Sequence, residues 1–220
     1  MKAYSRNSPS PLYVELLENY CIMHNEGQPK QNVPADKTFE GRSLPLQAES
    51  IFHTITEKSA NTILDYGSGK GLQYGPLKVT TSDGKSSFPD IKSYWGVQSI
   101  TCYDPGYEPF STLPEGRFDG VICTDVMEHL PLEDVPWVIN EIFSFARKFV
   151  FLSISCFPSK KFLPNDENAH CTVKPIEWWL ELLNCELKKW PTLSYTVVFI
   201  SLEIDPDTKE KKYKLSKYMS

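Results

Sequence analysis

The sequence predicts an α/β fold with a mostly parallel sheet, because short apolar runs alternate with stretches of helical periodicity. Residues 62–65, 120–124 and 149–155 are short, nearly continuous apolar runs, as expected of strands buried on both faces. Residues 135–146 place apolar side chains at helical spacing between two of these runs. This alternation is typical of strand–helix–strand units in a parallel sheet.

Further elements surround this core. Apolar positions at helical spacing predict two helices in an N-terminal extension, residues 1–60, and one more helix beginning near Ile176. Residues 99–103 are read as a strand, and residues 74–95 as a partly irregular insertion rich in turn formers. A closing antiparallel hairpin is expected from residues 185–190 and 195–204, followed by a lysine-rich solvated tail, 209–217. We expect a single domain spanning 1–220.

Composition narrows the possible partners. The 220 residues are 40% hydrophobic and carry a net charge of −5, which gives no general attraction to nucleic acid or to anionic membranes. No apolar run approaches the roughly 20 residues that span a bilayer, so a cytoplasmic location with no membrane association is the default expectation. The six cysteines are scattered singly, which favours free thiols over disulfides or a zinc site.

The stretch DYGSGKG, residues 65–71, follows the first predicted strand directly. Its three alternating glycines, Gly67, Gly69 and Gly71, indicate a special backbone path or a close ligand, since glycine weakens regular structure. The spacing GxGxG differs by one residue from the dinucleotide pattern GxGxxG, and the phosphate-binding pattern GxxxxGK[ST] is absent from the sequence. The sequence therefore gives little support for a dinucleotide-binding site or for a nucleoside-triphosphate site.

Together with two later motifs, this stretch resembles the first motif of the class I S-adenosylmethionine-dependent methyltransferases, DxGxGxG after a strand. Asp104, in the stretch SITCYDPG, stands where that family has an acidic residue that binds the ribose hydroxyls of the cofactor. It lies 33 residues after Gly71, more than the roughly 20 of a simple strand–helix–strand unit, and the insertion accounts for the excess. The stretch FDGVICTDVMEHL, from Phe118, is similar to the family's FDxVxxxxxxEHL at its fourth strand.

The resemblance implies a Rossmann-like three-layer sandwich with a mostly parallel seven-stranded sheet and a C-terminal antiparallel hairpin. It also implies that S-adenosylmethionine binds and that S-adenosylhomocysteine is released. The implied cofactor-binding residues are Asp65, Tyr66, Gly67, Ser68, Gly69, Gly71, Asp104, Pro105, Thr124, Asp125 and Val126. Phe110 or Ser111 is a candidate for the adenine contact, for which the family's usual acidic residue is missing.

The predicted reaction is methyl transfer to a hydroxyl or amine of a small molecule, such as a sugar or secondary metabolite. If the acceptor needs a base, His129 and His170 are the candidates, because an unperturbed imidazole titrates near pH 6.5. Each histidine also has a purely structural interpretation. The segment Phe39–Leu44 is interpreted either as part of a cofactor lid or as a plain linker. No metal site is expected from sequence spacing.

Three alternatives stay open. A nucleic-acid methyltransferase is disfavoured, because Thr124–Met127 is not the proline-aromatic tetrapeptide common in base-modifying enzymes of this fold. The acidic net charge also disfavours it, since phosphate binding requires clustered Lys and Arg. A non-catalytic partner subunit and an enzyme transferring another group from the same cofactor are compatible with the motifs. The sequence does not give the oligomeric state.

Overall fold

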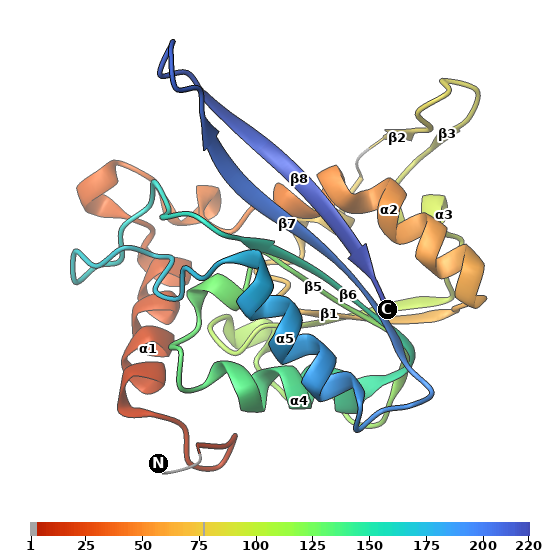
Figure 1. The fold of residues 1–220 in the computed structure, drawn as a ribbon, viewed down its shortest axis with the longest axis horizontal. Helices are drawn as coiled ribbons and strands as arrows, with labels where there is room; N and C mark the ends of the chain where they lie inside the picture. The colour runs from red at the N-terminus through yellow and green to blue at the C-terminus, as the bar shows by residue number, and fades with distance from the viewer. Residues whose placement is uncertain (1–3, 77) are drawn as a thin grey trace.

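Six strands form the central sheet of the computed structural model, which describes residues 4–76 and 78–220 (Figure 1). Their spatial order is β4-β1-β5-β6-β7-β8. In chain order they are β1 (Thr62–Tyr66), β4 (Ser99–Tyr103), β5 (Phe118–Thr124), β6 (Ala146–Ser155), β7 (Ser194–Ile204) and β8 (Lys211–Met219). All neighbours pair in parallel except β7 and β8, which are antiparallel. The predicted mostly parallel α/β sheet is confirmed, with six strands in place of seven.

Helices cover both faces of this sheet, which gives three layers (Figure 1). The helices are α1 (Pro11–Glu26), α2 (Ser43–Lys58), α3 (Ile91–Trp95), α4 (Val135–Phe145) and α5 (Ile176–Leu187). Alternate residues of β5 face opposite sides: Val121 and Cys123 pack with α4 and α5, whereas Ile122 packs with α2 and α3. Because such strands are buried on both faces, they consist almost only of apolar residues and could be predicted from the sequence.

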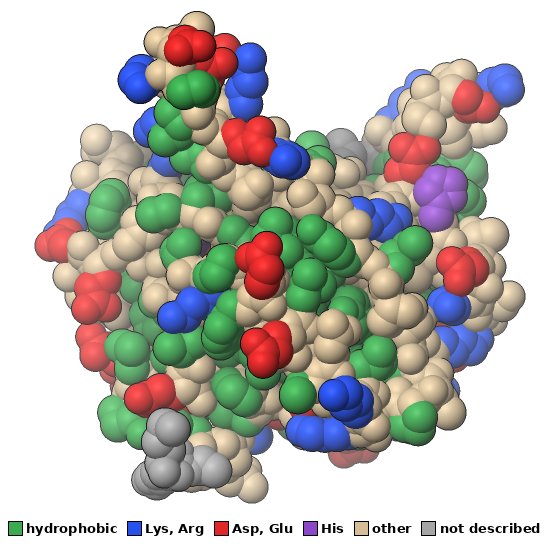
Figure 2. Space-filling model, in the orientation of Figure 1, with side chains coloured by type: hydrophobic (Ala, Val, Ile, Leu, Met, Phe, Trp, Pro, Cys, Tyr) green, Lys and Arg blue, Asp and Glu red, His purple; other side chains and the backbone are tan. Residues whose placement is uncertain are grey.

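The connection from β1 to β4 departs from a simple crossover. It contains a short two-stranded hairpin, β2 (Val79–Thr80) with β3 (Ser87–Phe88), and only the five-residue helix α3. This hairpin and the tip of β7–β8 project from the body, and charged side chains gather on both projections (Figures 1 and 2). The insertion predicted at residues 74–95 therefore corresponds to these small elements.

The predicted C-terminal hairpin exists, but one of its strands was wrongly placed. Cys185 to Leu187 belong to the end of α5, and β7 pairs instead with β8, which lies in the segment read as a solvated tail. The reason is that β8 is an edge strand whose residues are nearly all exposed, and its few apolar side chains stand among lysines, as in a solvated tail. Lysines suit such an edge because they oppose pairing with further strands.

The N-terminal residues are anchored to the end of β1. Arg6 Nε donates to Glu141 Oε2 on α4 at 2.7 Å, and Arg6 Nη2 donates to the Tyr66 hydroxyl at 3.0 Å. Tyr66 Oη in turn donates to Glu141 Oε1 at 2.7 Å. These bonds bring α1 beside the carboxyl ends of the strands, where open α/β sheets bind ligands.

None of the helices in residues 4–76 and 78–220 combines the length and the apolar character needed to cross a membrane.

Gly120 in β5 provides a test of sheet packing. A Cβ on Gly120 would lie 2.2 Å from Cζ of the Phe149 ring on the neighbouring strand. We expect Gly120→Ala to lower the free energy of unfolding by about 1–3 kcal/mol, as overpacking does in tight cores. Urea denaturation measures it, with Leu46→Ala as control because that side chain is 82% exposed and fills no core space. A loss in Gly120→Ala no larger than that in the control would contradict this packing argument.

Candidate functional site

A cavity of about 600 Å³ opens where β1, β4 and β5 end. Its wall is formed by residues 65–69 after β1, 104–106 after β4 and 124–126 after β5. Residues from α1 and from the 38–44 segment close the remaining side. The chain leaves β1 for β4 on one side and returns to β5 on the other, and such a change of direction is where α/β folds bind ligands.

The glycine loop is fixed by hydrogen bonds to the end of β4. Gly67 N and Ser68 N both donate to the Tyr103 carbonyl, at 2.7 and 3.1 Å. Gly69 N donates to Asp104 Oδ2 at 2.8 Å. Gly67 has φ +81°, and a Cβ there would lie 2.4 Å from Val126 Cγ2, so the loop can pass this point only as glycine.

All the predicted cofactor-binding residues except Gly71 lie on the cavity wall. The residues on its wall are Asp65, Tyr66, Gly67, Ser68, Gly69, Asp104, Pro105, Thr124, Asp125 and Val126. Gly71 instead packs away from it: a Cβ there would lie 2.9 Å from Cε2 of Phe110 and 3.3 Å from Sγ of Cys102. Phe110 thus supports the loop from behind.

Asp65 is fully buried and organises the chain that follows the glycines. Its Oδ2 accepts from Gln73 Nε2 at 3.0 Å and from Tyr74 Oη at 2.8 Å. Burial raises the pKa of Asp65 to about 7, although these two hydrogen bonds act in the opposite direction. Asp65 therefore titrates near neutrality.

Asp104 connects the loops after β1 and β4. Besides Gly69 N, it accepts from Gly106 N through Oδ1 at 2.9 Å, and burial raises its pKa despite both bonds. His24 Nε2 lies 3.9 Å from Asp104 Oδ1. Burial lowers the pKa of His24 to about 4, so His24 is neutral at pH 7 and the contact is not an ion pair.

Residues 20–44, which we call the N-terminal cover, lie over the glycine loop. Lys70 Nζ donates to the carbonyls of His24, at 3.0 Å, and Ala35, and lies 3.3 Å from Thr38 Oγ1. The imidazole of His24 stacks on Phe39, with ring centroids 4.2 Å apart. Since Phe39 and its neighbours line the cavity, this segment is part of the site rather than a remote linker.

Sequence reasoning missed the cover's contributions. Tyr20 was read as one more position on the apolar stripe of α1, and nothing in the sequence placed His24 or Lys70 near Asp104. These contacts connect residues far apart in the chain, so only the fold reveals them.

Asp125 follows β5 in a backbone conformation rare for a residue with a side chain, φ +61°. Ser43 Oγ, at the start of α2, donates to its Oδ2 at 2.9 Å. Burial alone would raise the pKa of Asp125, but the neighbouring imidazoles, Glu128 and Ser43 outweigh burial and lower it. Asp125 is therefore ionised at neutral pH. Strain at such a position is commonly retained for function.

Glu128 is buried beside Asp125. Its Oε1 accepts from Ser155 N at 2.7 Å, while its Oε2 has no hydrogen-bond partner in the described parts of the chain. Burial, and then the charge of Asp125, raise the pKa of Glu128 well above its ordinary value. Burial thus favours the protonated form of the Glu128 carboxyl.

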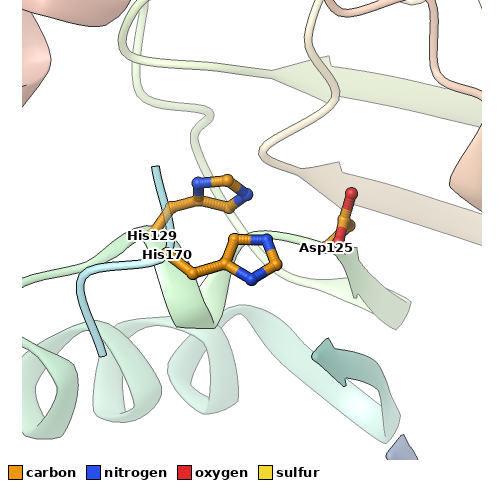
Figure 3. A group of neighbouring side chains, drawn as sticks. All are labelled: Asp125, His129 and His170. Carbon is orange, nitrogen blue, oxygen red and sulfur yellow. The ribbon is translucent and has the colours of Figure 1, made fainter. Parts of the chain in front are cut away.

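The two candidate bases, His129 and His170, lie together. His129 is on the cavity wall, and its Nδ1 is 2.8 Å from both the Tyr20 hydroxyl and the Ala169 carbonyl. Burial lowers the pKa of His129 to about 4, so the ring is neutral at pH 7. His170 comes from the loop before α5, and its ring stands perpendicular to that of His129 with centroids 4.8 Å apart (Figure 3).

The comparisons with known proteins give a likeness to solved structures alone. No protein-family model and no curated protein matches the chain. Among solved structures, magnesium protoporphyrin IX methyltransferase (ChlM) from Synechocystis PCC 6803 with bound SAH is similar over 94% of this chain and 95% of that one. The sequence identity is 12% and the TM-score 0.44. The assignment of the site accordingly rests on its own geometry.

Asp65 makes stability depend on pH. Because its folded-state pKa is about 7 and its ordinary value 3.8, the folded state keeps a proton that the unfolded chain loses. This contribution is fully present below pH 4 and disappears as the pH rises through 7. At about 1.4 kcal/mol per pKa unit, it amounts to a few kcal/mol at most.

We therefore expect Asp65→Asn, which keeps an oxygen acceptor, to be stabilised relative to wild type increasingly between pH 5 and 8. Urea unfolding at several pH values measures this difference. Asp83→Asn is the control, because the pKa of exposed Asp83 is lowered and its effect is confined to acid pH. A pH-independent difference for Asp65→Asn would refute the assignment.

Proposed function

We propose that the chain is a class I S-adenosylmethionine-dependent methyltransferase that methylates a hydroxyl or amine of a small molecule and releases S-adenosylhomocysteine. The proposal includes a single methyltransferase domain over 1–220 and a cytoplasmic location.

The observation that carries the proposal is the charge and hydrogen-bonding state of the cavity. The N–H groups of Gly67, Ser68 and Gly69 are already donated to Tyr103 and Asp104, so they offer no cradle for a phosphate. The carboxyls of Asp65, Asp104 and Asp125 line the same space. Such a site favours a ligand that brings hydroxyl donors and positive charge, as the ribose, ammonium and sulfonium of S-adenosylmethionine do.

Basic side chains on the cavity wall do not reverse this balance. Arg42 Nη2 lies 2.6 Å from Glu40 Oε2, and Lys37 Nζ lies 3.7 Å from Glu40 Oε1. Glu40 is a single carboxylate and offsets one of these two charges, and Lys161 is a third basic residue on the wall. Four carboxyl groups, those of Glu40, Asp65, Asp104 and Asp125, share the wall with these three cations. This lining is not the predominantly basic surface that a nucleic-acid acceptor would need.

Asp104 is the proposed ribose ligand. Each of its oxygens accepts one backbone N–H, which leaves the carboxylate fixed in orientation with lone pairs still available. Two such oxygens match two adjacent hydroxyls. The fixed orientation means that little freedom is lost when the ligand binds.

The reaction is an in-line displacement at the methyl carbon. The bond from carbon to sulfur breaks as the bond to the acceptor forms, and the electron pair stays on sulfur, giving the neutral thioether. The enzyme's main tasks are alignment and exclusion of water. The N-terminal cover closes the cavity, and neutral His129 on its wall is available to accept the acceptor's proton.

Calorimetric titration with S-adenosylmethionine and S-adenosylhomocysteine tests the cofactor assignment. We expect micromolar binding that Asp104→Asn weakens at least tenfold, about 1.4 kcal/mol. Asp119→Asn is the matched control: Asp119 also accepts a backbone N–H, from Asn61 at 2.8 Å, but at the opposite ends of β1 and β5. Absence of binding by folded wild-type protein would overturn the enzyme assignment and favour a partner subunit.

Gly67 supplies an independent test through its contact with Val126. Gly67→Ala should weaken cofactor binding at least tenfold, because the new methyl group displaces either the loop or Val126. Adding Val126→Ala should restore part of the affinity, since it removes the contacting atoms. Gly96→Ala, also at positive φ but with nothing within 4 Å, should bind normally. No recovery in the double variant would argue against this packing.

A further inference from the structure

Asp125, His129 and His170 form a cluster at the edge of the cavity (Figure 3). Each offers one ligand atom, and these atoms all lie within 4.8 Å of one another. The residues come from three places: directly after β5, the short helical turn that follows it, and the loop before α5. Asp125 and His129 are four residues apart in the chain, whereas His170 reaches them only through the fold.

Backbone carbonyls fix the proton positions on both imidazoles. The Ala169 carbonyl, 2.8 Å from His129 Nδ1, can only accept a hydrogen bond, so this nitrogen carries the proton. The Phe157 carbonyl, 2.7 Å from His170 Nδ1, sets the same state there. The ring nitrogen left to bind a metal ion is then Nε2 in both histidines. Histidines that bind metal ions are oriented by such bonds from their other ring nitrogen.

The third group is the Asp125 carboxylate, which is held by the Ser43 hydroxyl and sits on a strained backbone. Strain of this kind persists where the surrounding structure requires one particular side-chain position. Two imidazoles and one carboxylate are a donor set suited to divalent first-row transition metals. Three protein ligands leave further coordination positions open.

We propose that Asp125, His129 and His170 bind a divalent transition-metal ion that activates a hydroxyl of the methyl acceptor. The ion draws the ligand atoms together, since bonds of about 2.1 Å require ligand separations nearer 3 Å. Because Asp125 and His129 are also on the cavity wall, an open coordination position faces the acceptor.

The metal's role depends on the proposed methyltransferase function. With the ion bound, His129 is a ligand and no longer the base that takes the proton. The cation acidifies a coordinated hydroxyl instead, so its proton leaves to water and the alkoxide oxygen attacks the methyl carbon. The bond from carbon to sulfur breaks, and its electron pair stays on sulfur. The acceptor class is accordingly a hydroxyl compound rather than an amine.

Cobalt(II) titration of the metal-free, full-length protein, followed by visible absorbance, tests the site without any need for turnover. We expect one equivalent to bind, with a spectrum that lacks thiolate charge-transfer bands. His129→Ala and His170→Ala should each weaken binding at least tenfold. His53→Ala, on the exposed surface of α2, should bind as wild type does.

Cys171 neighbours His170, so Cys171→Ser excludes a thiolate ligand when it binds cobalt normally. S-adenosylhomocysteine titration and thermal unfolding of each variant show that the fold is retained. Failure of folded wild-type protein to bind one equivalent, or unchanged binding in both histidine variants, would overturn the metal site. Failure of the methyltransferase function would instead appear as absent S-adenosylhomocysteine binding, which the cobalt titration does not measure.

Discussion

The geometry of the cavity depends on the hydrogen bonds between the glycine loop and the end of β4. Three successive N–H groups, from Gly67 to Gly69, are donated to the Tyr103 carbonyl and the Asp104 carboxylate. They hold the loop between its neighbours while Gly67 rests against Val126 after β5. The ends of β1, β4 and β5 therefore form one unit, and the cavity wall cannot be changed at one strand without affecting the others.

The sequence predicted the elements that are buried on both faces. Runs such as 120–124 and 149–155 contain almost only apolar residues, so their assignment did not depend on tertiary context. β8 was missed because its apolar residues, such as Tyr213 and Leu215, are exposed and stand among lysines. Cys185 was misassigned because short apolar stretches suit helix and strand equally. The local sequence pattern is least informative for edge strands and for the ends of helices and strands.

The candidate site, too, was predicted from the sequence only in part. Motif spacing placed Asp65, Gly67 and Asp104 together because each lies at the end of a strand or directly after it, and parallel strands end at one edge of the sheet. The N-terminal cover had no such signal, since His24 reaches Asp104 and Lys70 only through the folding of α1 across the glycine loop. Likewise, His170 joins His129 through a long loop whose path the sequence did not define.

The lysines of β8 have a consequence for how copies of this protein behave beside one another in concentrated solution. Lys211, Lys212, Lys214 and Lys217 lie on an edge whose far side has no pairing strand in the described chain. Lys212 and Lys214 pair with Glu210 and Glu203, at 3.1 and 2.7 Å. A second chain that added a strand there, β8 against β8, would have to accommodate these salt bridges together with the charges of Lys211 and Lys217. Charged side chains of this kind oppose strand addition at an edge that no helix covers.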